Sequence, residues 1–146
     1  MAEESFPQLW QTALDTTDVR GLAEFYRLLL GWPYRPGDEP GDEPGDEQSG
    51  AGEEVDWLVL VSPDGARRLA FQQVDRLTPT TWPSHEVPMQ LHLDFTVSSV
   101  EELERHRTRA EALGARLVLD RSEDPDEPLY VLADPAGHPF CLFVAT

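Results

Sequence analysis

Apolar residues recur at helical spacing in two stretches of the chain, and each stretch carries signals for where a helix begins and ends. The first stretch has an apolar face at positions i, i+3, i+4 and i+7, formed by Leu22, Phe25, Tyr26 and Leu29. Asp18 and Ser99 precede the two stretches, and both are residue types that favour a helix N-cap. Gly31 and Gly114 follow them, where a left-handed residue commonly ends a helix. We therefore expect two helices in equivalent places of a repeat.

Short apolar runs surround both helices in the same order. The predicted strands are 9–16, 32–34, 57–62 and 68–74 in the first half, and 90–97, 116–119, 129–133 and 140–145 in the second. A shift of 81 residues places Gln11 on His92 and Asp18 on Ser99, so the halves form an internal repeat. The sequence thus predicts an α+β fold of two βαβββ modules related by a pseudo-twofold axis. The modules form cupped mixed sheets with the helices on the outer face.

The length of 146 residues fits a single domain at 1–146. Module one is expected at about 8–75 and module two at 89–146, joined by a linker at 76–88 whose prolines disfavour helix and central strand. Residues 36–54 interrupt module one with a GDEP repeat that holds eight acidic residues. Because this insertion has no apolar side chain larger than Ala or Pro, it is predicted to be disordered. It is interpreted either as an expanded surface loop or as an acidic arm or lid.

The charge balance excludes several classes of function. The chain has 11 basic and 28 acidic residues, a net charge of −17, and every basic residue is an arginine. Without lysine, Schiff-base chemistry and P-loop phosphate binding are excluded. The acidic surface disfavours nucleic acid and membrane partners. The single cysteine, Cys141, and the lack of an apolar leader predict a cytoplasmic protein.

The strand at 90–97 alternates between polar and apolar side chains, which places the two kinds on opposite faces of a sheet. The polar face holds Gln90, His92 and Asp94, and the apolar face holds Leu91, Leu93 and Phe95. Since an unpaired polar group in a dry core costs about 1–3 kcal/mol, the polar face is expected to line a polar cavity or solvent. Across a twofold axis, Gln11 would approach His92 at a shared site.

The Pro-x-Gly turns at 63–65 and 135–137 give a second alignment, which pairs Leu69 with Cys141 and Phe71 with Phe143. A cup with one polar and one apolar wall suits a small amphipathic organic molecule. The predicted ligand pocket comprises Gln11, Leu69, Phe71, Gln73, His92, Asp94, His138 and Phe143.

Four segments of the chain resemble the vicinal oxygen chelate superfamily, and more narrowly its glyoxalase-like and bleomycin-resistance branch. These segments are TTDVRGLAEFYRLLLGW, RLAFQQV, TWPSHEVPMQLHLDFTV and DPAGHPFCLF. The resemblance covers nearly the whole chain outside the acidic repeat and the first residues. It implies cupped sheets, commonly in a dimer, that hold a divalent metal and a substrate.

The resemblance also implies a metal site with ligands from the first and last strand of each module. The first-strand positions fall on Gln11 and His92, and the last-strand positions fall on Leu69 and Cys141. Leucine has no donor atom, so the implied metal ligands are Gln11, His92 and Cys141, and the metal site is degenerate. The candidate cofactor is a divalent ion of zinc, nickel, manganese or iron. No glutamate stands at these positions to serve as ligand and base, which disfavours glyoxalase-type isomerisation, and no catalytic residue is identified.

Structural explanations compete with these roles. His92 could be satisfied by a neighbouring side chain, Cys141 is typical of a small buried hydrophobe, and His138 is typical of an exposed turn. Trp57 and Trp82 could line the pocket or pack in the core.

Three hypotheses about function follow from the sequence. The first is a glyoxalase-like protein of unassigned substrate that binds a small organic molecule in the cup. The alternative is a metal-dependent lyase, isomerase or dioxygenase that uses Gln11, His92 and Cys141. The second alternative is a partner-binding module that uses the acidic loop. A homodimer is also predicted, because small cupped modules expose sheet edges.

Overall fold

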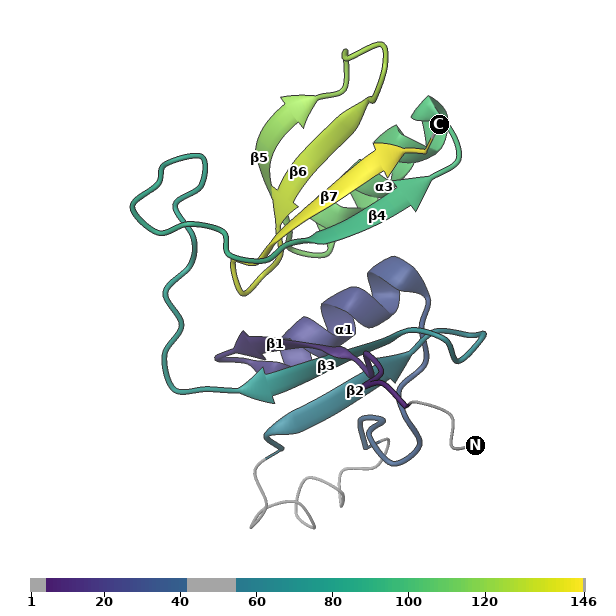
Figure 1. Ribbon diagram of the computed structural model, residues 1–146, viewed down its shortest axis with the longest axis vertical. Helices are drawn as coiled ribbons and strands as arrows, with labels where there is room; N and C mark the ends of the chain where they lie inside the picture. The colour runs from purple at the N-terminus through teal and green to yellow at the C-terminus, as the bar shows by residue number, and fades with distance from the viewer. Residues whose placement is uncertain (1–4, 42–54, 146) are drawn as a thin grey trace.

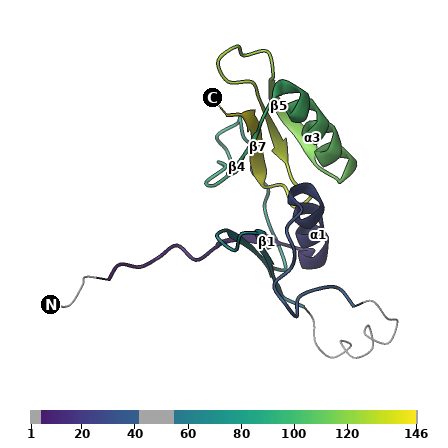
Figure 2. The same ribbon diagram turned by 90° about the vertical axis from the view of Figure 1, so that its right-hand side faces the viewer.

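The computed structural model describes residues 5–41 and 55–145. Its elements, in chain order, are β1 (Thr12–Thr16), α1 (Val19–Leu30), β2 (Trp57–Val61), β3 (Arg68–Gln73), β4 (Leu93–Val97), α3 (Val100–Ala112), β5 (Arg116–Arg121), β6 (Leu129–Ala133) and β7 (Pro139–Val144). They form two sheets that lie side by side, with their edge strands β1 and β4 next to each other, and both helices lie on the same side of these sheets (Figures 1 and 2). Residues 74–92, which join the sheets, contain no helix or strand.

The two sheets share one topology. The first has the strand order β1-β3-β2 and the second β4-β7-β6-β5. In each, the first strand of the module runs parallel to the last, and the other neighbours are antiparallel. The predicted strand at 32–34 is reduced to a single bridge between Tyr34 and Leu60, which leaves module one with three strands. The predicted α+β fold of two related modules is confirmed.

Local signals set the ends of both helices as expected. The Asp18 carboxylate accepts a hydrogen bond from the Gly21 amide, and the Ser99 hydroxyl accepts one from the Glu102 amide. Gly31 adopts the left-handed conformation (φ 71°) and donates its N–H to the carbonyl of Arg27. These contacts satisfy backbone groups that a helix end otherwise leaves unpaired.

One hydrophobic core joins the two modules. All four apolar residues predicted on α1 are buried. The Tyr26 ring lies 5.8 Å from Phe71 of module one, and 6.3 and 6.2 Å from Phe95 and Phe140 of module two. The α3 helix is far more polar and buries only Leu103 and Ala110. Helix α1 therefore holds the modules together, because its aromatic residues contact both sheets.

The strand register differs by one residue from the alignment of the two turns. Thr12 pairs with Leu69 in module one, and the equivalent Leu93 pairs with Phe140 in module two. The residue equivalent to Cys141 is therefore Ala70, and the expected pairing of Leu69 with Cys141 was wrong. The reason is the length of the connection, which spans 62–67 between β2 and β3 but only 134–138 between β6 and β7.

The acidic insertion is described only at its beginning. Asp38 forms an ion pair with Arg35 at 3.0 Å and accepts a hydrogen bond from the Val59 amide at 2.9 Å. The Asp38 carbonyl accepts a further bond from Arg20. The first GDEP unit is thus packed against β2, whereas residues 42–54, on which the predictions of disorder and of a partner-binding arm rest, lie outside the described residues.

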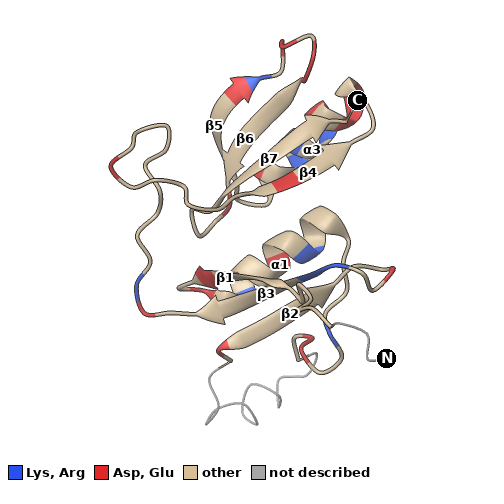
Figure 3. Ribbon diagram, in the orientation of Figure 1, with Lys and Arg blue, Asp and Glu red and all other residues tan. Residues whose placement is uncertain are grey.

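Figure 3 places the acidic residues mainly in loops and at strand ends of both modules. In the described parts of the chain, no helix combines the length and apolar character that crossing a membrane requires.

Candidate functional site

The site lies at the seam between the two modules. Strands β1 and β4 are the edge strands of their sheets, and they face each other across this seam (Figure 1). Two pockets open along it. We name them the linker pocket and the arginine pocket after the segment or side chains that distinguish them, and Thr12 of β1 and Leu93 of β4 line both.

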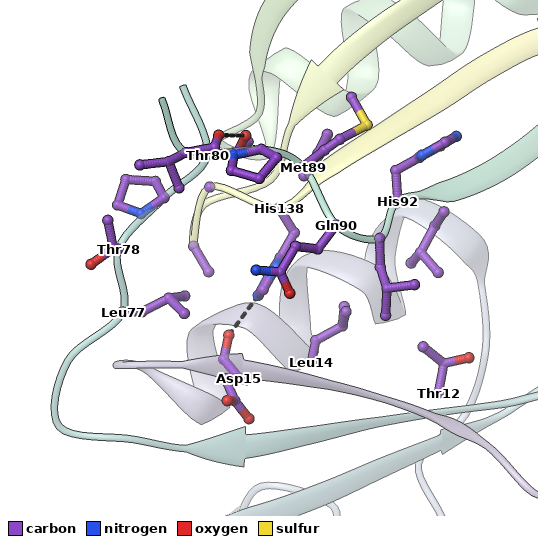
Figure 4. Close-up of a pocket in the computed structure, with 18 of the residues that line it drawn as sticks. Thr12, Leu14, Asp15, Leu77, Thr78, Thr80, Met89, Gln90, His92 and His138 are labelled. Atoms are coloured by element: carbon purple, nitrogen blue, oxygen red, sulfur yellow. Dashed lines mark hydrogen bonds between the residues drawn. The ribbon is translucent and has the colours of Figure 1, made fainter. Parts of the chain in front are cut away.

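The linker pocket has a volume of about 460 Å³ and is enclosed by β1, the linker and the turn before β7 (Figure 4). Its lining comprises residues 12–15, 77–80, 87–93 and 136–139. The imidazole Nε2 of His138 lies 2.6 Å from the backbone carbonyl oxygen of Asp15, which joins the turn of module two to the first strand of module one. Gln90 adopts a left-handed backbone conformation (φ 56°) that is uncommon for residues other than glycine.

A buried carboxylate holds the turn of the linker pocket. Asp134 accepts hydrogen bonds from the Tyr26 hydroxyl at 2.6 Å and from the amides of Ala136 and His138 at 2.9 and 3.0 Å. Burial raises the pKa of Asp134 above its usual value, and burial together with this carboxylate raises the pKa of Tyr26 well above 10.0. Tyr26 is therefore a protonated donor at neutral pH, and the turn is tied directly to the core.

The arginine pocket has a volume of about 690 Å³ and lies at the other end of the seam. Its walls come from residues 9–12, from Leu30 and Trp32, from residues 66–69 and from residues 93–96. The Arg68 guanidinium lies over the Trp10 ring at 4.3 Å from its centre, and its Nε donates to Gln11 Oε1 at 3.3 Å. Two arginines, an amide and one carboxylate thus stand in an otherwise largely apolar cleft.

His92, Asp94 and Cys141 form a third cluster. His92 Nε2 lies 3.3 Å from Asp94 Oδ1, and one donor atom of each of the three residues lies within 4.8 Å of the others. Asp94 and Cys141 are register partners on β4 and β7, so their side chains point to the same face. Burial, and secondly the Asp94 carboxylate, raise the pKa of the Cys141 thiol to about 11. Without a metal, Cys141 is therefore a neutral thiol.

The donor set fits a zinc-like ion. Tetrahedral zinc with bonds of about 2.0–2.3 Å brings its ligands to roughly 3.5 Å from one another, which small side-chain movements would achieve here. A nitrogen, an oxygen and a sulfur donor suit zinc, whereas a thiolate is a poor match for manganese. The three residues would leave one coordination position for water or substrate.

The structure distributes the predicted pocket residues over several places. Gln11, Leu69 and Asp94 line the arginine pocket, while His92 and His138 line the linker pocket. Gln11 and His92, which were expected to approach each other, thus line different pockets.

The other three predicted pocket residues are outside both linings. Phe71 is fully buried and stacks on Tyr26 in the core. Gln73 accepts a hydrogen bond from the Val19 amide and donates one to the Thr17 carbonyl, so it holds the start of α1. Phe143 lies half-buried on β7. The ligand-binding roles of all eight residues remain predictions.

Sequence reasoning missed most of the arginine pocket. Arg67 and Arg68 were not selected, and the indoles in the lining are Trp10 and Trp32 rather than Trp57 or Trp82. One signal was present in the sequence: two adjacent arginines at the start of a strand in a chain with net charge −17. The two tryptophans had no such signal, because only folding brings the N-terminal arm, which we define as residues 5–11, to the end of α1.

Comparison with known structures gives the same fold. A glyoxalase/bleomycin resistance protein/dioxygenase family enzyme from Burkholderia phytofirmans superimposes with a TM-score of 0.64 at 15% identity, covering 93% of this chain and 97% of that one. The fosfomycin resistance protein FosX from Mesorhizobium loti has a TM-score of 0.65 at 13% identity, covering 97% and 95%. A mutant of FosX from Listeria monocytogenes, complexed with Mn(II) and 1S,2S-dihydroxypropylphosphonic acid, has a TM-score of 0.67 at 17% identity, again covering 97% and 95%.

No curated protein matches the chain in sequence. The sequence model of the glyoxalase-like domain family, by contrast, matches residues 11–143. This range includes all the described strands and helices except the last residue of β7. This match agrees with the two βαβββ modules and with the resemblance found in the sequence. The chain belongs to the glyoxalase-like domain family.

Proposed function

We propose that this protein binds a small organic molecule in the arginine pocket. The observation that carries the proposal is a cleft of about 690 Å³ whose walls come from both modules and which combines apolar side chains with a few polar groups. Ligand sites for small molecules have this size and composition and often lie between structural units. The metal site implied by the family is degenerate in this reading, because neither Leu69 nor its structural neighbour Ala70 offers a donor atom.

A variant that fills the pocket tests this proposal. Ala66 is exposed and lines the arginine pocket, so Ala66→Trp is expected to block the cleft without disturbing the core. A fragment library is screened by NMR against the wild type, Ala66→Trp and the control Ala112→Trp, an exposed position on α3. We expect fragments that bind the wild type and the control but not Ala66→Trp. Fragments that bind all three proteins equally, or no binding at all, would contradict the proposal.

A second candidate is a metal-dependent enzyme, favoured by the cluster of His92, Asp94 and Cys141. Asp94 also lines the arginine pocket, so a metal held by the cluster would lie next to the proposed ligand. A bound zinc ion would act as a Lewis acid toward a substrate oxygen. The chain's own part would be to supply the three ligands and to orient the substrate between the two modules.

Metal binding is tested with Zn(II) and with Co(II) as a spectroscopic probe. We expect stoichiometric zinc uptake, and a thiolate charge-transfer band with cobalt that disappears in Cys141→Ser and His92→Ala. The control is His85→Ala, which removes an exposed histidine of the linker. Because metal binding must displace the thiol proton, uptake should weaken as the pH falls. A wild type without the cobalt band at saturating metal would rule out the thiolate ligand and, with it, this candidate.

A further inference from the structure

We propose that the ligand of the arginine pocket is an organic anion with a planar apolar body, such as an aromatic carboxylate. The inference rests on the proposed function, since it takes the arginine pocket as the ligand site, and it adds the chemical class of the ligand. Four features support it: the state of the two arginines, the placement of Arg68, the two indoles and the position of the one carboxylate.

Arg67 and Arg68 form no ion pair with a carboxylate in the described part of this acidic chain. Within residues 5–41 and 55–145, the arginines that lie within 4.0 Å of a carboxylate are Arg27, Arg35, Arg105 and Arg107. The two arginines of the pocket are not among them, although the chain carries 28 acidic residues. Two adjacent guanidinium groups give the pocket a local positive charge inside a field that otherwise repels anions.

Two contacts restrict the Arg68 side chain before any ligand binds. Its Nε donates a hydrogen bond to Gln11 at 3.3 Å, and its guanidinium carbon lies 4.3 Å from the centre of the Trp10 ring. The terminal N–H groups have no acceptor in the described part of the chain. A guanidinium presents a fork of donors that matches a carboxylate in a bidentate pair. Because these contacts already limit the conformations of the side chain, less conformational entropy is lost when the anion binds.

The apolar wall suits a planar body. Trp10 is 68% exposed and Trp32 is half-buried, and Leu9 beside them is 92% exposed. Exposed large apolar side chains at a pocket mark a surface that gains free energy when it is covered. Two indoles offer stacking surfaces that aliphatic side chains lack.

Asp94 is the one carboxylate in the described lining of this pocket, and it does not cancel the arginines. It lies on β4 of module two, 3.3 Å from the His92 imidazole, whereas on module one Arg67 lies in the turn before β3 and Arg68 is the first residue of β3. The pocket therefore has a cationic side and an acceptor side. The linker pocket has no arginine in its lining, so an anion distinguishes the two pockets.

The experiment compares 2-naphthoate with 2-naphthamide, which has nearly the same shape but no charge. Binding is measured by isothermal titration calorimetry on the full chain, with Trp fluorescence as a second signal. We expect the carboxylate to bind the wild type at least about tenfold more tightly than the amide, the effect of one charge-assisted hydrogen bond. Arg68→Gln should abolish this preference and Arg67→Gln should reduce it. Arg116→Gln makes the same change in net charge at an exposed position on β5 and should retain the preference.

Each other outcome has a defined meaning. Equal affinity for the two probes in the wild type overturns the anionic class and leaves the proposed function standing. Equal losses in Arg68→Gln and Arg116→Gln also overturn it, because the preference would then come from net charge and not from the pocket. If neither probe binds while fragments distinguish Ala66→Trp from its control, the ligand class is wrong but the site is right. Arg68→Lys, which keeps the charge but not the fork, replaces Arg68→Gln if the latter fails to fold, and should lose most of the preference.

Discussion

The linker pocket and the arginine pocket share a seam but differ in how their walls are held. In the linker pocket the turn at 134–138 is bound through buried Asp134 to the core residue Tyr26. In the arginine pocket the corresponding turn at 62–67 is organised by Asp64, which is exposed and accepts hydrogen bonds from Ser62 and Ala66. Burial raises the pKa of Asp134, whereas these hydrogen bonds lower the pKa of Asp64.

Because their turns are held differently, we interpret the two pockets as having different roles. A wall bonded to the core opens only when much of the domain unfolds, whereas a wall made of an exposed turn and an extended arm adjusts at low cost. Figure 2 shows that the N-terminal segment before β1 projects away from the rest of the molecule. The linker pocket is thus interpreted as a rigid joint between the modules, and the arginine pocket as the adaptable site where a ligand is bound.

The largest effect is expected from Asp134→Ala. The substitution leaves the Tyr26 hydroxyl and the amides of Ala136 and His138 without their acceptor, and should lower the free energy of unfolding by about 3 kcal/mol. Urea denaturation measures this loss. The matched control is Asp64→Ala in the other turn, which should leave stability nearly unchanged. Equal effects of the two substitutions would remove the contrast between the pockets.

Tyr26→Phe should cost less, about 1–2 kcal/mol at neutral pH, because Asp134 keeps its two amide donors. The raised pKa of Tyr26 also predicts a pH dependence. The folded state retains a proton that the unfolded chain releases, so this contribution to stability is complete below about pH 10 and declines as the pH rises further.

Urea denaturation of the wild type and of Tyr26→Phe at neutral and strongly alkaline pH checks this sign. The variant should lose less stability than the wild type between the two conditions. Tyr34, whose pKa burial and Glu24 raise to about 12, keeps a smaller dependence in both proteins. A steeper alkaline loss in the variant would contradict the assignment.

His138→Ala should have a still smaller effect, about 1 kcal/mol, because it removes one contact across the seam, to the Asp15 carbonyl. Hydrogen exchange should become faster in β1 while the affinity of the arginine pocket for its ligand stays the same. His85→Ala, in the exposed part of the linker, serves as the control. A loss of ligand affinity in His138→Ala would show that the two pockets are coupled.

The last prediction concerns the homodimer, and its outcome has the smallest consequence for the structure of a single chain. Phe6 in the N-terminal segment and Leu91 at the linker pocket are exposed, and pairing would cover such side chains. Sedimentation at micromolar concentration should give twice the mass of 16.4 kDa. A monomer at this concentration would refute the dimer and leave both pockets with the walls described here.

The sequence by itself determined the local structure and the family. Asp18, Ser99 and Gly31 act within one helical turn, and the apolar face of α1 follows from spacing alone, so these features could be read without knowing the fold. The structure also shows the repeat of 81 residues, because β1 starts at Thr12 and the equivalent β4 starts at Leu93. Both predicted first strands were three residues too long at their start, since the arm and residues 90–92 have no neighbouring strand to pair with.

Tertiary structure decided the site. Its residues come from the N-terminal segment and the start of β1, from the end of α1, from the turn before β3, from β3 itself and from β4. Their distances depend on how the two sheets meet rather than on spacing in the chain. The register of the strands is also decided by pairing between distant segments. The connection between β2 and β3 has one residue more than the connection between β6 and β7, so each residue of β3 was matched to the wrong residue of β7 and to the wrong face of the sheet. Asp134 shows the same principle, since only the packing of Tyr26 from the other module turns a surface type of residue into a buried hydrogen-bond acceptor.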